Sequence, residues 1–482
     1  MKKIKIIHKS LILTFILVTL LFSCHDAFME HPKSIISPDA FYKNPAQIEG
    51  VLAKSFSRTG YFFNFWNPWF TFQHSDELSG GNLVIPPDHG VDVWNRQFNT
   101  IMNMNYVIYA IQKGQVEEGS KSEINNLLGM AKFIRGWAYF CLVRFWGPVP
   151  ILTEKDVEGN YFSLKPARSS IEDVYNLITS DFQTGIDLMK DNPGQSSKPS
   201  KGVAKAYLAK AYLTIATYPI NNSTYYDKAA KIAWEIIQSG DYSLVEDIDK
   251  VFSYETEEGP EMMLSFHAND ACWMDFPQYL SAMRGGWSSF VADLRWVERY
   301  PEQPRKNAYL DLYNENGEYY ADISKNPGLR KYFYGADWER GWADSHIPLI
   351  RYADVLLIFA EAANMANGAP TENAVWAINQ IIQRANGYKE NPKHPLTTID
   401  MSKESFDEKV IQEREWELCF EPHWGRWSDL IRKRLLKEKI REEYLPNFNE
   451  EDYLFPIPET DLRLNDNLDQ NPGYPNPYKN QK

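Results

Sequence analysis

The sequence predicts a mainly α-helical protein whose helical hairpins stack like tetratricopeptide units, with long aromatic-rich loops and little strand. Three observations support this prediction. Apolar residues recur at helical spacing in several segments, Gly and Pro separate those segments, and two stretches lose the helical period and collect aromatic residues instead. A pair of helices in roughly 35 residues has the size of one tetratricopeptide unit. Such a hairpin has to bury its apolar face against others of its kind.

The clearest hairpin runs from Arg351 to Gly387. Gly368 and Pro370 should end its first helix, because Gly accepts left-handed dihedral angles and Pro cannot donate a backbone hydrogen bond. Thr371 is the expected N-cap of the second helix. The stripes expected to be buried are Leu356, Phe359, Ala360 and Ala363 in the first helix and Val375, Ile378, Ile381 and Ile382 in the second.

The remaining helices follow the same pattern. They are expected over residues 98–110, 124–145, 171–189, 202–217, 225–238, 403–421 and 427–439. The helical scaffold therefore covers about 98–250 and 347–440, and the variable aromatic loop regions cover about 61–97 and 251–346. Residues 441–482 are rich in Pro and Asn and should form an extended tail over the scaffold.

Residues 1–23 have the pattern of a signal peptide. Four lysines precede an apolar stretch from Leu11 to Phe22 that is too short for a comfortable membrane span. Cys24 then stands where a bacterial lipoprotein carries the Cys that becomes its lipidated first residue; the alternative is an ordinary secretory signal with an incidental Cys. Without residues 1–23, 47 basic against 64 acidic residues leave a net charge of −17, which argues against nucleic acid as a partner.

Short motifs along nearly the whole chain resemble those of a known family. They are RGWAYF at 135–140 with FWGPVP at 145–150, RYADVLL at 351–357 with AEA at 360–362, AINQ at 377–380 with RA at 384–385, YLFPIP at 453–458, and QNPGY at 470–474. Together they are similar to the SusD/RagB family of outer-membrane nutrient-binding lipoproteins of Bacteroidetes-type bacteria. The chain departs from the family pattern at 413–429, where Pro422 and His423 occupy a turn.

The resemblance implies a SusD-like helical scaffold that binds its ligand without catalysis. It implies a protein anchored by lipid in the cell outer membrane, facing the surface, that captures an oligosaccharide for a SusC-like TonB-dependent transporter. In the family the ligand lies on exposed aromatic residues of loops. Because the RagB branch serves peptide uptake, an acidic aromatic cleft that holds extended peptide is the alternative.

A carbohydrate site needs flat aromatic platforms for the apolar faces of sugar rings and polar groups at the rims. The two aromatic regions hold eight of the 15 tryptophans. We expect the platforms at Trp66, Trp94, Trp287 and Trp296 and their polar partners at Asp76, Arg96 and Arg284. The alternative for any one of these tryptophans is that it covers the helical core.

A glycoside hydrolase is the less favoured interpretation. Such an enzyme needs two carboxylates on opposite sides of a sugar, whereas Asp76 and Glu77 are sequence neighbours. A group of glutamates and arginines near the C-terminus favours structural ion pairs; it consists of Glu413, Glu417, Glu421, Arg414, Arg426 and Arg432. The sequence contains no HExxH, GxSxG, P-loop or dinucleotide fingerprint.

No cofactor is expected. His267, His346 and His423 are isolated in the sequence, which favours structural roles over metal binding. Structural calcium on loop carboxylates stays open, without a specific signal for it.

Overall fold

The computed structural model describes residues 41–60, 76–78, 90–158, 163–192, 194–267, 291–314, 316–323, 325–334, 336–337, 342–421, 425–439, 446 and 448–479. Residues 44–482 form one compact unit, and the description below is confined to that unit. The expected signal peptide and Cys24 lie outside the described residues. None of the described helices is both long and apolar enough to cross a membrane.

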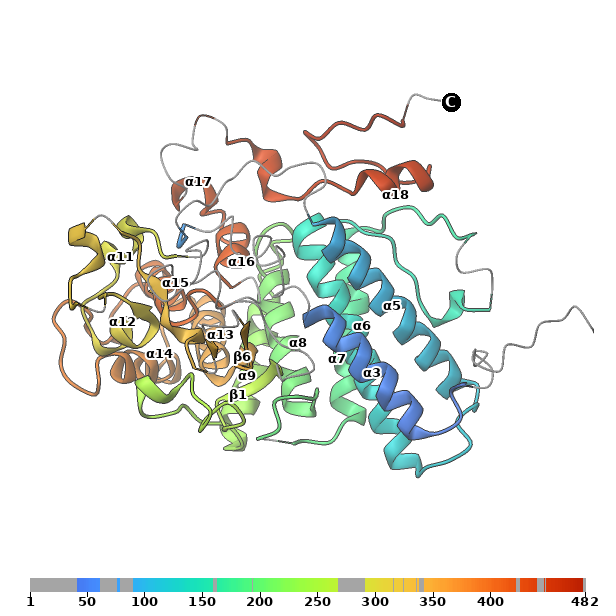
Figure 1. The fold of residues 1–482 in the computed structure, drawn as a ribbon, viewed down its shortest axis with the longest axis horizontal. Helices are drawn as coiled ribbons and strands as arrows, with labels where there is room; N and C mark the ends of the chain where they lie inside the picture. Colours follow the sequence, from blue (N-terminus) through green and yellow to red (C-terminus); the bar gives the residue numbers. More distant parts are fainter. Residues whose placement is uncertain are drawn as a thin grey trace, which may run out of the picture. The chain divides into compact units, whose positions relative to one another are not determined.

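The predicted mainly α-helical fold with few strands is confirmed (Figure 1). The helices are α3 Pro45–Gly60, α5 Val91–Gln112, α6 Lys121–Trp146, α7 Ile171–Leu188, α8 Lys201–Ile215, α9 Tyr225–Ser239, α11 Leu294–Arg299, α12 Pro304–Tyr309, α13 Tyr352–Asn367, α14 Glu372–Ala385, α15 Lys403–Glu417, α16 Gly425–Arg432, α17 Leu436–Lys439 and α18 Glu459–Leu464. The strands are β1 Met262–Phe266, β2 Leu310–Asp311, β3 Gly328–Leu329, β4 Ala336–Asp337, β5 Trp342–Ala343 and β6 Ile347–Arg351. They pair antiparallel as β1–β6, β2–β3 and β4–β5.

The long helices pack in chain order. Each helix from α5 to α9 lies against the next one, and α3 packs on both α5 and α6. α13 then lies beside α9, although the whole second aromatic region separates them in the sequence (Figure 1). α13 in turn packs against α14 and α15. The stack of hairpins is therefore continuous in space, although the second aromatic region lies between α9 and α13 in the sequence.

The hairpin of α13 and α14 forms as predicted. Gly368 adopts the left-handed conformation, with φ of 79°, and ends α13. The Oγ1 atom of Thr371 accepts a hydrogen bond of 3.1 Å from the backbone N–H of Ala374, which caps α14. Ile378, Ile381 and Ile382 are buried, and the small side chains beside them let α13 approach closely. Within the predicted stripe, Val375 is only half-buried.

Three helices differ most from the prediction in their bounds, and one of them is α15, which ends at Glu417 rather than at Glu421. α5 begins at Val91 rather than near Phe98, because Gly90 takes the left-handed conformation just before it and the apolar period already includes Val93. The last predicted helix is divided into α16 and α17, where Arg434 has a φ of 59°.

The C-terminal tail lies over the end of α6. The backbone N–H of Phe455 donates to the carbonyl of Phe145 at 2.7 Å, and the indole N–H of Trp146 donates to the carbonyl of Pro456 at 3.0 Å. Asn471 donates through Nδ2 to the carbonyl of Trp146 at 3.1 Å. The tail therefore satisfies carbonyls that the end of a helix leaves without partners. It is not wholly extended, because it contains α18.

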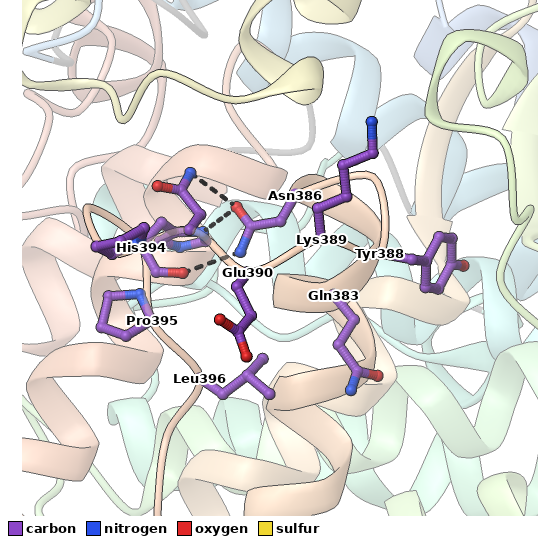
Figure 2. A pocket seen from close by; sticks show the side chains of 10 residues that line it. Gln383, Asn386, Tyr388, Lys389, Glu390, His394, Pro395 and Leu396 are labelled. Atoms are coloured by element: carbon purple, nitrogen blue, oxygen red, sulfur yellow. Dashed lines mark hydrogen bonds between the residues drawn. The ribbon is translucent and has the colours of Figure 1, made fainter.

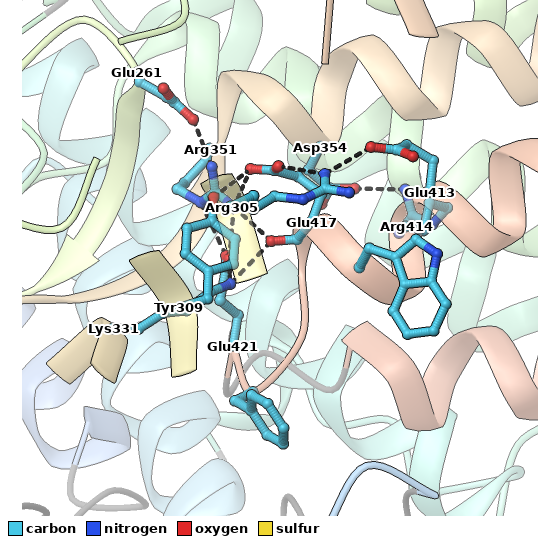
Figure 3. Close-up of polar contacts among 12 residues, drawn as sticks. Glu261, Arg305, Tyr309, Lys331, Arg351, Asp354, Glu413, Arg414, Glu417 and Glu421 are labelled. Atoms are coloured by element: carbon cyan, nitrogen blue, oxygen red, sulfur yellow. Dashed lines mark hydrogen bonds and ion pairs between the residues drawn. The ribbon is translucent and has the colours of Figure 1, made fainter. Parts of the chain in front are cut away.

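Buried charges fill the space between α12, α13, α14, α15 and the β1–β6 pair (Figure 3). The four carboxylates of this charge cluster are Glu261, Glu413, Glu417 and Glu421, and its four cations are Arg305, Lys331, Arg351 and Arg384. The predicted structural ion pairing of the glutamates is confirmed, but with other partners. Glu413 and Glu417 are fully buried and pair with Arg305 at 2.6 and 2.9 Å rather than with the arginines near them in the sequence.

Arg414 and Arg432 form a second buried network. Arg414 bridges Asp354 at 2.7 Å and Asp429 at 2.8 Å. Arg432 donates to the other oxygen of Asp429 at 2.8 Å and to Glu361 at 2.7 Å. Because these carboxylates sit on α13 and α16, the network fixes the contact between the hairpin and the end of the helical stack.

Candidate functional site

The two aromatic regions of the sequence meet at one place in the structure. Leu78, from the first region, forms an antiparallel bridge with Ala292, from the second. Beside the bridge, the backbone N–H of Asp293 donates to the carbonyl of Glu77 at 2.8 Å. The carboxylate of Asp293 then caps α11 by accepting from the backbone N–H of Arg295 at 2.9 Å. We call this contact between residues 76–78 and 291–293 the junction. It fixes the described ends of both regions relative to the scaffold.

A polar pocket of about 550 Å³ lies next to the junction. Its lining comes from the junction, α11, α15 and α17 and consists of Asp76, Asp293, Arg295, Trp296, Arg299, Gln412, Glu415, Trp416, Glu438 and Lys439. Two of the predicted site residues, Asp76 and Trp296, thus reach the same pocket. Besides Asp76 and Glu415, five of the lining side chains are ionisable, among them the half-exposed Arg295 and Arg299. The pocket offers hydrogen-bond donors and acceptors in plenty and little apolar surface.

Asp76 is held by two arginines. Its carboxylate accepts two hydrogen bonds from Arg426, at 2.8 and 3.0 Å, and one from Arg299 at 3.1 Å. Burial alone would raise the pKa of Asp76, but the positive charge of Arg426 brings that pKa below its usual value. Arg426 also pairs with Glu415 at 3.0 Å. Asp76 was predicted as a direct ligand partner; the structure instead uses its oxygens to fix Arg299 at the pocket.

Glu77 is a feature that sequence reasoning missed. Its side chain is buried, one carboxylate oxygen accepts from the backbone N–H of Phe420 at 3.1 Å, and the other has no hydrogen-bond partner among the described residues. Burial raises the pKa of Glu77 to about 8. At neutral pH the group is therefore mostly an uncharged carboxylic acid, placed directly under the junction.

Trp94 does not present its ring as a platform. It lies on α5, is 2% exposed, and packs against Trp146 at the end of α6 with ring centroids 5.3 Å apart. Its indole N–H donates to Asp461 of the tail at 3.1 Å. The prediction treated this stretch as loop, and the early start of α5 at Val91 is the reason for the error. Arg96, the polar partner predicted beside it, is half-buried on the same helix.

Trp296 is likewise a packing residue. It is 1% exposed and contacts Trp416, Tyr300 and Phe420 with ring centroids between 5.1 and 5.4 Å. The interpretation that a loop tryptophan covers the helical core therefore describes both Trp94 and Trp296. Trp66, Arg284 and Trp287 lie outside the described residues.

A second pocket, of about 520 Å³, follows the end of α14 (Figure 2). Tyr388 stands at its edge with 60% of its surface exposed and with φ of 58°. Gln383, Lys389 and Glu390 supply polar groups around the opening. The sequence gives no signal for this pocket, because a single Tyr in a polar loop forms no pattern.

His394 forms the floor of this second pocket. It is 1% exposed, and one ring nitrogen contacts Asn386 at 3.2 Å (Figure 2). The other ring nitrogen contacts Glu413 at 2.7 Å. The burial of Glu413 and its bonds to His394 and Arg305 keep this carboxylate away from solvent. Glu413 and Glu417 are therefore structural residues, and neither is placed to act on a bound sugar.

Two family models match the chain. One is described as the SusD family and covers residues 304–474, and the other is described as "Starch-binding associating with outer membrane" and covers residues 54–213. The chain is 27% identical to SusD-like protein P2 of Formosa agariphila, over 98% of this chain and 100% of that protein. A SusD homologue of Bacteroides thetaiotaomicron has a similar structure, with a TM-score of 0.77 at 21% identity over 92% of this chain and 99% of that one. A laminarin-binding SusD-like protein matches with a TM-score of 0.73 at 19% identity, over 90% and 100% of the two chains.

Proposed function

This chain belongs to the SusD family, and from that premise we propose that it is a non-catalytic outer-membrane lipoprotein that binds an oligosaccharide and delivers it to a SusC-like TonB-dependent transporter. One observation carries the proposal most directly. The two aromatic-rich regions meet at the Leu78–Ala292 bridge beside a polar pocket. The stretches of chain that lead into Asp76 and Val291 at this bridge carry four of the eight loop tryptophans.

The ligand site of this proposal combines polar groups at the pocket with residues of the two aromatic-rich regions. The half-exposed Arg299, fixed by Asp76, supplies a rigid donor at the rim of the pocket, and Gln412 supplies an amide. Trp66 and Trp287 supply the flat faces, and Arg284 donates to hydroxyl groups. A sugar ring stacks one apolar face on an aromatic ring while its hydroxyls bond to the rim.

Calorimetry tests the carbohydrate part of the proposal. The chain from His25 onward is titrated with a panel of oligosaccharides, beginning with β-glucans because a structural relative is named for laminarin, and with a panel of extended peptides. Trp287→Ala and Arg299→Gln should weaken saturable glycan binding. Trp376→Ala is the matched control, because Trp376 is 41% exposed on α14 and outside both aromatic regions.

The outcomes separate the candidate ligands. Glycan binding that Trp287→Ala leaves unchanged would remove this site from the proposal. Binding of peptides alone would overturn the carbohydrate assignment in favour of RagB-like peptide uptake. Hydrolysis of any glycan in the panel with ordinary turnover would contradict the non-catalytic part.

The lipid anchor is tested separately. We propose that Cys24 carries the acyl chains, which hold the protein on the surface-facing leaflet through hydrophobic transfer rather than through charge. Cells that express the chain in labelled palmitate should incorporate label, and Cys24→Ala should abolish it. Incorporation that survives Cys24→Ala would refute the anchor and leave the carbohydrate test unaffected.

A further inference from the structure

The antiparallel pairing of β1 and β6 brings together two histidines that are far apart in the sequence. In this register Phe266, the last residue of β1, lies opposite Ile347, the first residue of β6. His267 therefore follows one strand at the point where His346 precedes the other. Their rings stack with centroids 3.6 Å apart and an angle of 23° between the planes.

A carboxylate and a hydroxyl face the same imidazoles. Nε2 of His267 lies 3.2 Å from Oε1 of Glu258 and 2.9 Å from Oγ of Ser196. The backbone N–H of Ser196 donates to the other oxygen of Glu258 at 2.9 Å, which fixes the direction of this carboxylate. One ligand atom each from Glu258, His267 and His346 lies within 4.8 Å of the others.

Two polar atoms beside this group have no partner among the described residues. Nδ1 of His346 is buried without a hydrogen bond, and so is Oε2 of Glu257, 3.6 Å away. The backbone of His346 is held in place, because its carbonyl accepts from the hydroxyl of Tyr334 at 3.1 Å. A buried polar atom without a hydrogen bond needs an explanation, and a bound water or ion is one of them. Asp344 adds another carboxylate two residues before His346, so the surroundings are acidic.

We propose that Glu258, His267 and His346 bind a divalent transition-metal ion, with Zn²⁺ as the best match. Two imidazole nitrogens and one carboxylate oxygen, with a fourth position left for water, are a common zinc ligand set. Bonds of about 2.0–2.1 Å in a tetrahedron place ligand atoms roughly 3.3 Å apart. The pair His267 and Glu258 has that separation already, at 3.2 Å. The third ligand atom lies within 4.8 Å of the other two, and one of the two stacked imidazoles has to rotate so that both ring planes contain the ion. Ca²⁺ is a poorer match, because it prefers six to eight oxygen ligands.

The ion would join three separate parts of the chain. Glu258 lies in the loop before β1, His267 follows β1, and His346 precedes β6. His267 also immediately precedes the segment that carries Arg284 and Trp287. The metal therefore fixes the base of that segment, and this role in orienting a ligand site rests on the function proposed above.

Cobalt spectroscopy and zinc competition test the metal site. Purified protein without a polyhistidine tag is stripped with a chelator and titrated with Co²⁺, which absorbs visibly in a tetrahedral site, and Zn²⁺ is then added to displace it. We expect one Co²⁺ per chain, displaced by Zn²⁺, and an unfolding temperature that rises on adding Zn²⁺. His267→Gln, His346→Gln and Glu258→Gln should each weaken binding more than tenfold. Glu255→Gln is the matched control, since Glu255 is exposed, three residues from Glu258, and bonded to Lys250.

The comparison uses the shift in unfolding temperature on adding Zn²⁺, so a variant that folds less stably still gives a result. The proposal is overturned if the wild-type protein takes up no Co²⁺ or Zn²⁺ at micromolar concentration. It is equally overturned if the double variant His267→Gln/His346→Gln binds the ion as the wild type does. Glycan calorimetry on the stripped protein separates the two proposals: glycan binding without any metal uptake overturns the metal site alone. Metal uptake without glycan binding overturns the carbohydrate site alone.

Discussion

Glu417 should be one of the side chains on which the stability of the scaffold depends most. Its carboxylate is fully buried and accepts from Tyr309 at 2.9 Å, Arg384 at 2.8 Å, Arg351 at 3.1 Å and Arg305 at 2.9 Å. Burial would raise its pKa, but the guanidinium groups of Arg384, Arg351 and Arg305 outweigh burial and lower that pKa well below the ordinary value. Glu417 is therefore charged at neutral pH.

Glu417→Gln keeps the size and shape of the side chain and removes its charge. The charge cluster holds four carboxylates and four cations, so the variant leaves one buried cation uncompensated and turns an NH₂ donor towards guanidinium donors. Breaking one partner of a buried ion pair costs about 3–5 kcal/mol. With an unfolding entropy of about 2.1 cal/mol/K per residue, a unit of over 400 residues should lose roughly 3–6 °C in unfolding temperature.

Urea unfolding followed by tryptophan fluorescence measures the loss in the free energy of unfolding. Glu408→Gln is the matched control on the same helix, because Glu408 is exposed and should change the free energy of unfolding by less than about 0.5 kcal/mol. Arg384→Met combined with Glu417→Gln removes one charge of each sign, so the double variant should lose less than the sum of the two single variants. A loss below about 1 kcal/mol for Glu417→Gln, or strict additivity in the double variant, would refute the reasoning that the cluster is tightly coupled.

Three further perturbations follow from the described geometry. In Glu77 the folded-state pKa of about 8 exceeds the ordinary value of 4.5, so the folded form keeps its proton between these pH values while the unfolded form has lost it. The free energy of unfolding should therefore fall as the pH rises through this window, by up to about 4 kcal/mol. Glu77→Gln should flatten this pH dependence in unfolding curves recorded from pH 5 to 9. An equal pH dependence in the variant and the wild type would contradict the burial of an acid at this position. Asn471→Ala removes hydrogen bonds to the carbonyls of Trp146 and Phe455 and should cost about 1–3 kcal/mol in the same assay. Asn467→Ala should cost less, because the hydrogen bond from Asn467 to the carbonyl of Lys165 lies at the surface. Gly368→Ala places a Cβ at a φ of 79° in open space. The backbone strain of an L-residue in this conformation should by itself cost about 1 kcal/mol in the free energy of unfolding. An unchanged unfolding temperature would show that α13 can end without the left-handed turn.

The parts of the fold that local chemistry determines could be predicted from the sequence. The ends of α13 and α14 follow from Gly368, Thr371 and a stripe of isoleucines, all of which act within a few residues. The β1–β6 pair could not be predicted, because its register joins segments on either side of the whole second aromatic region. For the same reason the sequence showed His267 and His346 as unrelated residues.

The candidate site was predicted less well than the fold. The convergence of the two aromatic regions was not expected, since it depends on a single backbone bridge between Leu78 and Ala292. Composition marks a tryptophan as part of an irregular stretch, but its exposure depends on which distant element covers it. The tail packs over Trp94, and α15 packs over Trp296. Neither contact can be inferred from the residues that flank these tryptophans in the sequence.

The bonds between the tail and the end of α6 also bear on the order in which the protein can mature. The backbone of Phe455 and the side chain of Asn471 complete a helix that the ribosome finished hundreds of residues earlier. The end of α6 therefore lacks these bonds until the tail has been synthesised. A protein truncated before Phe455 should therefore keep that helix end open to proteases.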